Sequence, residues 1–347
     1  MSLNQNLEKL SNAQGVTGRE NQVRDLLGEM LTPYCDEIQV DRMENIIAVK
    51  KGKPKAPKIM LAAHMDEVGL MVKTITKEGF IQFSKLGGID DRILAAQKVT
   101  VFTKKATYPG IVGSKPPHIQ KEEERKKIMN FDELFIDVGA ENKDDALKMG
   151  LAVGDPIAFD VKYTKIGREC VLGKAFDNRA GCAAMVETMK LLKESDCTVF
   201  AVGTVQEEVG LRGAGTAAFA VDPDLALALD VTIAGDVPGV REYDTSVKLG
   251  KGTSLTVSDS GVITHPKIMR WILDTANEEK IPLQLESGLL GSTDAARISL
   301  TRQGIPSGTL SIPTRYIHSP ASILSLVDLE NTAKLAAAAI SRASKYF

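Results

Sequence analysis

Three apolar segments, each ending close to an ionisable residue, constrain the fold of this chain more than any other feature. The segments are "KIMLAAH", "TVFAVGTVQ" and "LALALD", and the helix-like stretches "GCAAMVETMKLLKES" and "GAGTAAFAV" lie between them. A strand that is apolar on both faces is typical of the buried interior of a parallel sheet. Strands that alternate with helices therefore predict an α/β fold, in which helices cover both faces of a mixed, mostly parallel sheet.

The segment from 70 to 163 has a different pattern. Short β-like pieces such as "LMVKTI", "GFIQFS" and "KVTVFT" alternate with turn residues, and no long amphipathic helix separates them. This pattern predicts a small β-rich module inserted into an α/β domain of residues 1–69 and 164–347. The charged run Lys121–Lys127 within the module predicts a solvated loop or the surface of a helix.

A helix is also predicted near the N-terminus. Thr17 and Glu20 have the spacing of a capping box, in which two side chains satisfy backbone N–H groups at the start of a helix. Apolar residues then recur at helical spacing from Val23 to Leu31, and Pro33 ends the run. We therefore expect Thr17 and Glu20 to cap this helix.

The charge balance excludes several classes of partner. The chain has 43 basic and 45 acidic residues, a formal net charge of −2, and no apolar run of the roughly 18 residues that a membrane span needs. Neither nucleic acid nor a membrane is therefore an expected partner. The N-terminal segment lacks a basic and then apolar signal pattern, so we expect a cytoplasmic location. Cys182 and Cys197 have no metal or redox spacing and are expected to be reduced packing residues.

The first candidate site residues lie at the end of one predicted strand and at the start of one predicted helix. His64 and Asp66 are two residues apart, which places both side chains on one face of a strand. A metal-binding histidine usually donates its second ring N–H to a carboxylate, so His64 is a candidate ligand with Asp66 beside it. A strand-end histidine paired with a surface aspartate is the alternative. Asp177 can cap the predicted helix or face the edge of the sheet where ligands bind.

Two adjacent glutamates, Glu207 and Glu208, follow the second apolar segment. Two carboxylates in one site raise each other's pKa unless a positive charge lies nearby, and a divalent metal ion removes that penalty. One glutamate could then bind metal while the other transfers protons; an exposed acidic turn is the alternative. The glycines that follow resemble a phosphate loop only loosely, because the glutamates would repel phosphate and no P-loop lysine is present.

Two further candidates lie later in the chain. Asp230 ends the third apolar segment, where an acid is well placed to be a ligand, and His318 lies in "RYIHSP". A lone histidine such as His318 is more often structural than a ligand. Asp236 is expected to be structural, and His118 and His265, each beside a proline, are expected to be loop or cap residues.

Taken together, these candidates supply two imidazoles and three carboxylates. A single zinc ion takes four ligands, so the set suits two metal ions that share one carboxylate. Two metal ions about 3.5–4 Å apart can share a hydroxide and polarise a carbonyl, as in aminopeptidases. The five residues are His64, Asp177, Glu208, Asp230 and His318.

The order of these motifs resembles that of a known family. "HMDEVG", "AFDNRAG", "VQEEVGLRGA", "ALDV" and "RYIHSP" are similar to motifs of the tetrahedral, glutamyl-type aminopeptidases, metallopeptidase family forty-two. The resemblance covers nearly the whole chain, including "SKPPH" in the β-rich segment and "GSTDAARI" near Asp294. It implies a dinuclear zinc-peptidase fold with an inserted, barrel-like dimerisation domain, for which the long gap between His64 and Asp177 leaves room.

The resemblance also implies roles for the site residues. Glu207 corresponds to the general base that acts on metal-activated water, and Asp66 corresponds to the residue behind His64. The implied cofactors are two divalent metal ions, zinc or cobalt, and the implied activity is hydrolysis of N-terminal residues from short peptides. Relatives assemble from dimers into homododecamers. The implied metal ligands are Asp177 as the bridge, His64 and Asp230 at one site, and Glu208 and His318 at the other.

The N-terminal residue of the substrate is expected to be neutral or apolar. An enzyme for acidic residues needs a cation in its side-chain pocket, and no arginine or lysine lies between Gly252 and Pro266, while Leu289 and Leu290 are apolar.

Three alternatives to an aminopeptidase remain open. A dinuclear deacylase or carboxypeptidase would need no free α-amine on the substrate, an endoglucanase would leave both histidines without a role, and a non-catalytic peptide-binding scaffold would lack metal.

Overall fold

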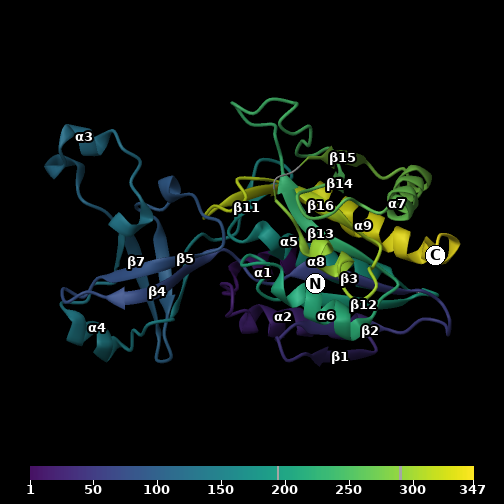
Figure 1. Ribbon diagram of the computed structural model, residues 1–347, viewed down its shortest axis with the longest axis horizontal. Helices are drawn as coiled ribbons and strands as arrows, with labels where there is room; N and C mark the ends of the chain where they lie inside the picture. Colours follow the sequence, from purple (N-terminus) through teal and green to yellow (C-terminus); the bar gives the residue numbers. More distant parts are fainter. Residues whose placement is uncertain (194, 289–290) are drawn as a thin grey trace.

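The computed structural model describes residues 1–193, 195–288 and 291–347, and it has two parts (Figure 1). The larger part is a layered α/β domain, and the smaller part is a closed β-barrel formed by the middle of the chain. This arrangement confirms the predicted fold class, an α/β sheet with an inserted barrel-like module. The barrel strands begin at Gly69 and end at Phe159.

The α/β domain is built on a sheet of eleven strands within the described residues. Its central strands follow the order β12-β3-β13-β16 and are parallel, whereas the strands beside them pair antiparallel. The predicted parallel arrangement therefore applies to the centre of a mixed sheet. The strands are β1 (Glu37–Val40), β2 (Ile46–Lys50), β3 (Lys58–His64), β10 (Thr164–Ile166), β11 (Cys170–Gly173), β12 (Thr198–Thr204), β13 (Leu225–Ile233), β14 (Thr253–Ser258), β15 (Leu283–Ser287), β16 (Ser307–Arg315) and β17 (Ser322–Ser325).

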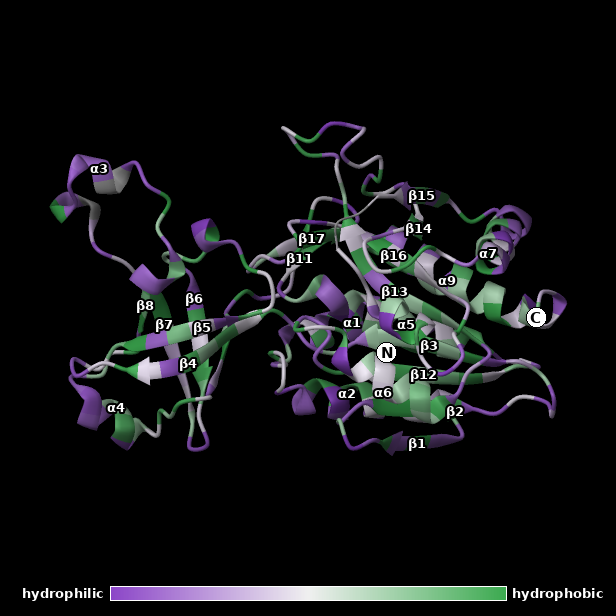
Figure 2. Ribbon diagram, in the orientation of Figure 1, coloured by the Kyte–Doolittle hydropathy of each residue, from purple (hydrophilic) through white to green (hydrophobic). Residues whose placement is uncertain are grey.

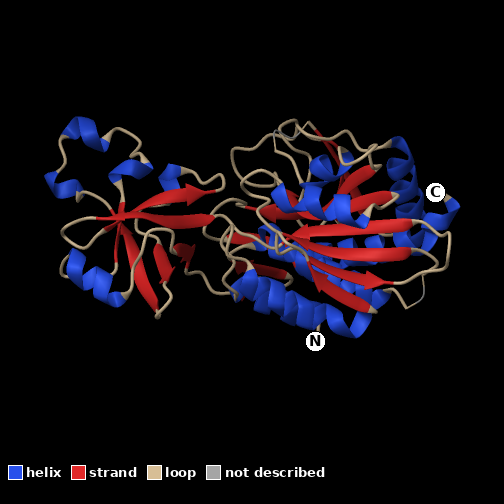
Figure 3. Cartoon of the chain, turned by 60° about the horizontal axis from the view of Figure 1, so that its bottom comes forward, coloured by secondary structure: helices blue, strands red, loops and turns tan. Residues whose placement is uncertain are grey.

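Helices cover both faces of this sheet (Figure 3). Helices α1, α2, α5, α7 and α9 form a layer on one face, and α6 and α8 pack together on the other. No helix among the described residues is both long enough and apolar enough for a membrane span. The helices are α1 (Leu3–Asn12), α2 (Asn21–Leu31), α5 (Phe176–Leu191), α6 (Arg212–Val221), α7 (Pro266–Glu279), α8 (Asp294–Ser299) and α9 (Leu326–Arg342).

Strand β3 shows how the sequence produces these layers. Successive side chains of a strand point to opposite faces of the sheet. Ile59, Leu61 and Ala63 therefore join the hydrophobic core beneath α5, whereas Met60 and Ala62 join the core beneath α6. Residues Ile59–Ala63 of the strand are apolar and buried on both faces, and Figure 2 shows the hydrophobic colour of the central strands.

The inserted module is a six-stranded barrel with the strand order β4-β5-β8-β7-β6-β9. Its interior is a separate hydrophobic cluster that includes Leu70, Phe83, Val101 and Ile157. The charged run Lys121–Lys127 contains the short helix α3, as predicted for a solvated segment. The elements are β4 (Gly69–Ile75), β5 (Ile81–Leu86), β6 (Lys98–Phe102), β7 (Thr107–Gly113), α3 (Glu122–Arg125), β8 (Phe135–Asp137), α4 (Lys143–Met149) and β9 (Pro156–Phe159).

A buried group of charges joins the N-terminal segment to the end of β3. The Glu67 carboxylate, in a side chain with 3% exposure, accepts hydrogen bonds from Lys174 at 2.7 Å and from Arg179 at 3.1 Å. Arg179 also donates to the carbonyl oxygens of Leu10 and Gly15. The group therefore holds α1 and the strand that carries His64 in one arrangement.

Replacing Glu67 with alanine is expected to lower the free energy of unfolding by about 3–5 kcal/mol, because two buried cations would lose their counter-charge. Denaturant unfolding at fixed protein concentration measures this loss. The matched control is Glu330→Ala, which removes an exposed pair with Lys334 and is expected to cost below about 1 kcal/mol. Equal effects of the two substitutions would contradict a structural role for the buried group.

Candidate metal centre

All predicted site residues meet at the C-terminal edge of the parallel strands. His64 ends β3, Asp230 lies near the end of β13, and Asp177 lies in the first turn of α5. Glu207 and Glu208 follow β12, and His318 follows β16. This is the edge at which ligands bind in open α/β sheets, because the loops after parallel strands converge there.

Asp177 lies between two groups of potential metal ligands. Its Oδ1 is 3.0 Å from Nε2 of His64, and its Oδ2 is 3.3 Å from Nε2 of His318. In each group, one ligand atom per residue lies within 4.8 Å of the others. The groups are His64, Asp177 and Asp230, and Asp177, Glu208 and His318. Asp177 therefore presents one oxygen to each group, and the residues that the sequence predicted as ligands lie together in the predicted pairs.

The charge of the site fits metal ions. Burial raises the pKa of both Glu208 and Asp230 to about 8, and repulsion from Asp177 contributes to each shift. Oε1 of Glu208 is buried and has no hydrogen-bond partner among the described residues. Imidazole nitrogen and carboxylate oxygen are ligands that zinc accepts. The residues present therefore supply both the donor atoms and the uncompensated negative charge that two divalent ions require.

The two histidines and Asp177 stabilise one another's charged forms. Burial alone would raise the pKa of Asp177, but the hydrogen bonds from His318 and His64 hold it well below its ordinary value. Burial would lower the pKa of His64, yet the charge of Glu207 and the bond to Asp177 raise it well above its ordinary value. The hydrogen bond to Asp177 is the main reason that the pKa of His318 rises to about 9.

Asp66 organises the centre from behind. Its side chain is fully buried, and its carboxylate accepts hydrogen bonds from the backbone N–H groups of Glu207 at 3.0 Å and Glu208 at 3.2 Å. Nδ1 of His64 lies 3.4 Å from the same carboxylate and 3.2 Å from the Asp66 carbonyl oxygen. Asp66 therefore fixes the imidazole and the glutamate turn together, and Nε2 of His64 faces the site.

Thr17 supports Asp66, and the predicted capping box is wrong. Helix α2 begins at Asn21, and no side chain caps it. The Thr17 hydroxyl instead donates to Oδ2 of Asp66 at 2.9 Å, and Glu20 accepts from the backbone N–H of Gln206. The competing long-range contacts hold these side chains more effectively than the helix terminus does, so the local spacing gave a false signal.

Substitution of Thr17 by valine is expected to weaken metal binding by about 10-fold, since residues that orient a metal ligand contribute on that scale. The change keeps the shape of the side chain and removes the hydroxyl, which donates to Asp66 at 2.9 Å and lies 3.3 Å from the Glu67 carbonyl oxygen. Competition with a chelating dye measures the affinity. Thr32→Val is the control, because the Thr32 hydroxyl donates to Gly28 on an exposed helix end. Unchanged affinity in the Thr17 variant would contradict the role of this hydroxyl.

Glu207 lies beside the ligand groups without belonging to either. Its side chain has about 10% exposure, and its Oε2 lies 3.9 Å from Nε2 of His64. Burial raises the pKa of Glu207 well above its ordinary value, and attraction by His64 offsets part of that rise. Repulsion from Asp294 raises the pKa of Glu207 further. The buried carboxylate of Asp294 accepts a hydrogen bond from the Thr204 hydroxyl at 2.5 Å. The sequence had assigned no role to Asp294.

The barrel module also contributes to the centre, which the sequence did not predict. Nδ1 of His318 lies 2.9 Å from the carbonyl oxygen of Gly88, in the connection between β5 and β6. A Cβ on Gly88 would lie 3.2 Å from that nitrogen, and Gly87, at φ +82°, lies against Val68 and Glu208. Donation to Gly88 leaves Nε2 of His318 facing Asp177. Two consecutive glycines after a strand were the available signal.

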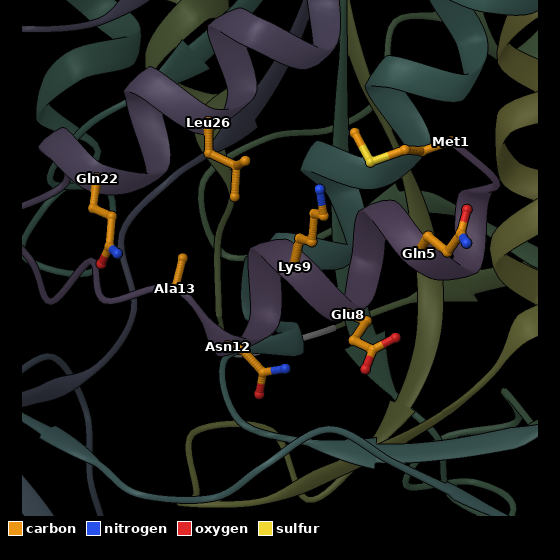
Figure 4. A pocket seen from close by; sticks show the side chains of 8 residues that line it. All are labelled: Met1, Gln5, Glu8, Lys9, Asn12, Ala13, Gln22 and Leu26. Carbon is orange, nitrogen blue, oxygen red and sulfur yellow. The ribbon is translucent and has the colours of Figure 1, made fainter.

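A cavity of about 650 Å³ opens directly on this centre. The five ligand candidates line this cavity, together with Glu207. A second cavity of about 780 Å³ lies between α1 and α2 (Figure 4). Its charged lining residues are Glu8 and Lys9, and it contains none of the potential metal groups found in the described chain. The first cavity is therefore the candidate active site.

Residues predicted to be structural have structural contacts. Asp236 pairs with Arg315 at 2.6 Å, and His265 caps α7 by accepting from the Lys267 backbone N–H. Cys182 is fully buried, and burial raises the pKa of its thiol to about 12, as expected for a packing residue. His118 lies on the exposed surface of the inserted module. Leu289 and Leu290, considered as pocket residues, lie outside the described residues.

Comparison with known proteins decides the family. The profile of the M42 glutamyl aminopeptidases matches residues 44–335. The chain belongs to this family. The resemblance inferred from the motifs is therefore confirmed, and the M42 protein is a peptide-bond hydrolase from a family of metallopeptidases.

Named relatives of this M42 protein are aminopeptidases. A putative aminopeptidase of Acetivibrio thermocellus is 42% identical over 334 residues, covering 96% of this chain and 97% of the relative. The lysyl aminopeptidase of Pyrococcus furiosus is 37% identical over 335 residues, covering 96% of this chain and 95% of the relative. These relatives align along almost the entire M42 chain.

Solved structures agree in fold with the M42 protein. The TET aminopeptidase of Thaumarchaeota archaeon SCGC AB-539-E09 is 41% identical with a TM-score of 0.95, covering 98% of this chain and 96% of that one. The Pyrococcus horikoshii TET1 peptidase, which can assemble into a tetrahedron or a large octahedral shell, is 32% identical with a TM-score of 0.87. That comparison covers 98% of this chain and 99% of the TET1 chain.

Proposed function

We propose that this M42 protein is a metal-dependent aminopeptidase that removes N-terminal residues from short peptides, with two divalent ions, zinc or cobalt, in each subunit. His64, Asp177 and Asp230 would hold one ion, and Asp177, Glu208 and His318 the other. The observation that carries this proposal is the position of Asp177, whose two carboxylate oxygens face different histidines at 3.0 and 3.3 Å. A bridging carboxylate between two ligand groups is typical of two-metal hydrolases.

The side chains divide the chemistry between them. When bound, the ions supply Lewis-acid polarisation of a carbonyl and make water acidic near neutral pH. Glu207 takes the proton of the attacking water and returns it to the leaving amine, as a general base and then a general acid. Burial raises the pKa of Glu207 above its ordinary value, which favours uptake of a proton by this carboxylate. Asp66 holds the backbone of Glu207, so this carboxylate keeps its position beside the ligand groups.

A free α-amine on the substrate distinguishes this activity from that of a deacylase or carboxypeptidase. Asp177, Glu207, Glu208 and Asp230 place negative charge at one end of the cavity, which attracts an N-terminal ammonium group. We expect leucyl peptides with a free N-terminus to be hydrolysed and their N-acetylated counterparts to resist hydrolysis. Liquid chromatography of the products measures both. Equal hydrolysis of the acetylated peptide, or release of the C-terminal residue, would contradict the proposal.

We also propose that the M42 chains form dimers through the barrel module and assemble into a homododecamer in the cytoplasm. Several large apolar side chains on the module are exposed in the single chain, and such surfaces favour contacts between proteins. The shell assemblies of the related TET1 peptidase support the same conclusion. The exposed apolar residues are Ile111, Ile119, Ile128, Leu147 and Val153.

A further inference from the structure

The wall of the active-site cavity away from the ligand groups is polar and lacks a compensating cation. It is formed by the ends of β13 and β14 and by residues that lie between β15 and α8, among them Ser292 and Thr293. No arginine or lysine is among the described residues that line the cavity. Asp244 also lines it, but this carboxylate is already paired with Arg241 at 3.0 Å. The lining residues of the wall are Thr232, Ile233, Thr256, Asp259, Ser292 and Thr293.

Glu286 lies directly behind this wall. Glu286 has a relative exposure of 5%, and its Oε2 accepts a hydrogen bond from the Thr232 hydroxyl at 2.6 Å. The register of β14 and β15 pairs Glu286 with Thr256, which places both side chains on the same face of the sheet. Its second oxygen, Oε1, is buried and has no partner among the described residues. A buried carboxylate oxygen without a partner is costly, so this oxygen would be stabilised by a hydrogen-bond donor.

Asp259, which lines the cavity, also has a carboxylate oxygen without a hydrogen-bond partner among the described residues. Its Oδ1 accepts hydrogen bonds from the backbone N–H groups of Gly261 and Val262, both at 2.7 Å. Its Oδ2 is buried and has no partner among the described residues, and neither has the hydroxyl of Ser292. Asp259, which follows β14 and lines the cavity, and Glu286, on β15 behind the lining, therefore each have one carboxylate oxygen without a partner among the described residues.

We propose that this wall is the subsite for the side chain of the substrate's N-terminal residue and that it selects a cationic side chain, that of lysine or arginine. The inference rests on the proposed aminopeptidase function, because it places the scissile bond at the ligand groups. The unsatisfied oxygens of Glu286 and Asp259 accept hydrogen bonds from the cation, and Ser292 adds a neutral partner. A neutral side chain would leave these oxygens unpaired, and an acidic one would be repelled.

The spacing of the cavity suits such a side chain. Asp230 and Thr232 are two residues apart on β13, a separation of about 6–7 Å along a strand. The hydroxyl of Thr232 contacts Glu286, so the carboxylate lies about one long side chain away from the ligand groups. Leu211, Ile233 and Ile317 line the cavity and can pack against the flexible four-carbon stem of a lysine.

This proposed substrate class differs from the neutral or apolar residue expected from the sequence. The absence of a cation between Gly252 and Pro266 remains an argument against acidic substrates. The sequence placed Asp259 in that segment without a role, and it gave no signal that Glu286 would meet the same cavity. Burial raises the pKa of Glu286 to about 7, so a bound cation would also hold this carboxylate in its ionised form.

Matched substrates test the subsite. The metal-loaded enzyme is assayed with p-nitroanilides of lysine, norleucine, Nε-acetyl-lysine and glutamate, because norleucine has the lysine stem without the ammonium group. We expect kcat/KM for the lysyl substrate to exceed that for the norleucyl substrate by on the order of 10- to 100-fold, the scale of a buried charge pair. Competitive inhibition by free L-lysine and L-norleucine measures the same preference without turnover. Equal or greater activity on norleucyl substrate would overturn the proposal.

Charge-removing variants locate the effect. Glu286→Gln and Asp259→Asn are each expected to reduce the lysyl-to-norleucyl ratio of kcat/KM by about 10-fold or more. Glu29→Gln, on the exposed face of α2, should leave the ratio unchanged. An unchanged ratio in both wall variants would refute the cationic subsite, while continued hydrolysis of norleucyl substrate would leave the aminopeptidase function intact. If the wild-type enzyme hydrolysed none of the substrates, the proposed function itself would be refuted.

Discussion

Glu207→Gln is expected to lower kcat on short peptides by on the order of 100- to 10,000-fold, the usual contribution of a general acid–base group. Glutamine keeps the size of the side chain and its hydrogen-bonding capacity, but it cannot accept the proton of water. The backbone N–H of Glu207 would still donate to Asp66, so the turn that also carries Glu208 should keep its shape. The metal content is therefore expected to equal that of the wild type.

The measurement combines steady-state kinetics with metal analysis of the same preparation. Glu242→Gln is the matched control, because it removes the charge of an exposed glutamate. Among the described residues, this glutamate forms an ion pair with Lys248. We expect the control to have wild-type activity and metal content. Full activity in the Glu207 variant would rule out its role as the base, and loss of metal would show that it acts as a ligand.

Asp177→Ala is expected to remove metal from both ligand groups and to abolish activity. Asp177 is the one residue shared by the two groups found in the described chain, and each of its oxygens faces a different histidine. Its loss would also leave His64 and His318 without the carboxylate that holds them. Metal content after dialysis against buffer of defined free metal concentration is expected to fall from about two ions per chain, the number of a dinuclear site, to below one.

Variants of the unshared ligands are the controls for this prediction. Asp230 belongs to one group and Glu208 to the other, so Asp230→Ala and Glu208→Ala should each weaken one site and retain most of the metal at the other. If Asp177→Ala retained as much metal as these variants, a bridging role for Asp177 would be excluded. Circular dichroism of each variant shows whether the fold is kept.

The sequence predicted the fold where local pattern and tertiary structure agree. Segments that are buried on both faces, such as β3 and β13, have the continuous apolar pattern of central strands, and they formed the parallel centre of the sheet. The outer strands were harder to predict. β10 and β17 have three and four residues, too few for a periodic pattern, and β17 pairs antiparallel with β11, which is distant in the sequence.

The candidate ligands could be found because each stands at the end of an apolar strand or in a distinctive motif. The contacts that support these ligands could not be predicted, because they join segments that are far apart in the sequence. Thr17 reaches Asp66, and Gly88 of the barrel reaches His318, and neither residue type is informative by itself. The same is true of Glu286, whose importance depends on its meeting Thr232 across the cavity wall.

The central claim is that two metal ions share Asp177, and anomalous diffraction from crystals of the metal-loaded enzyme tests it most directly. The account predicts two anomalous peaks in each chain, about 3.5–4 Å apart, with Asp177 in contact with both. His64 and Asp230 should contact one peak, and Glu208 and His318 the other. A single peak, or two peaks of which only one contacts Asp177, would contradict the account.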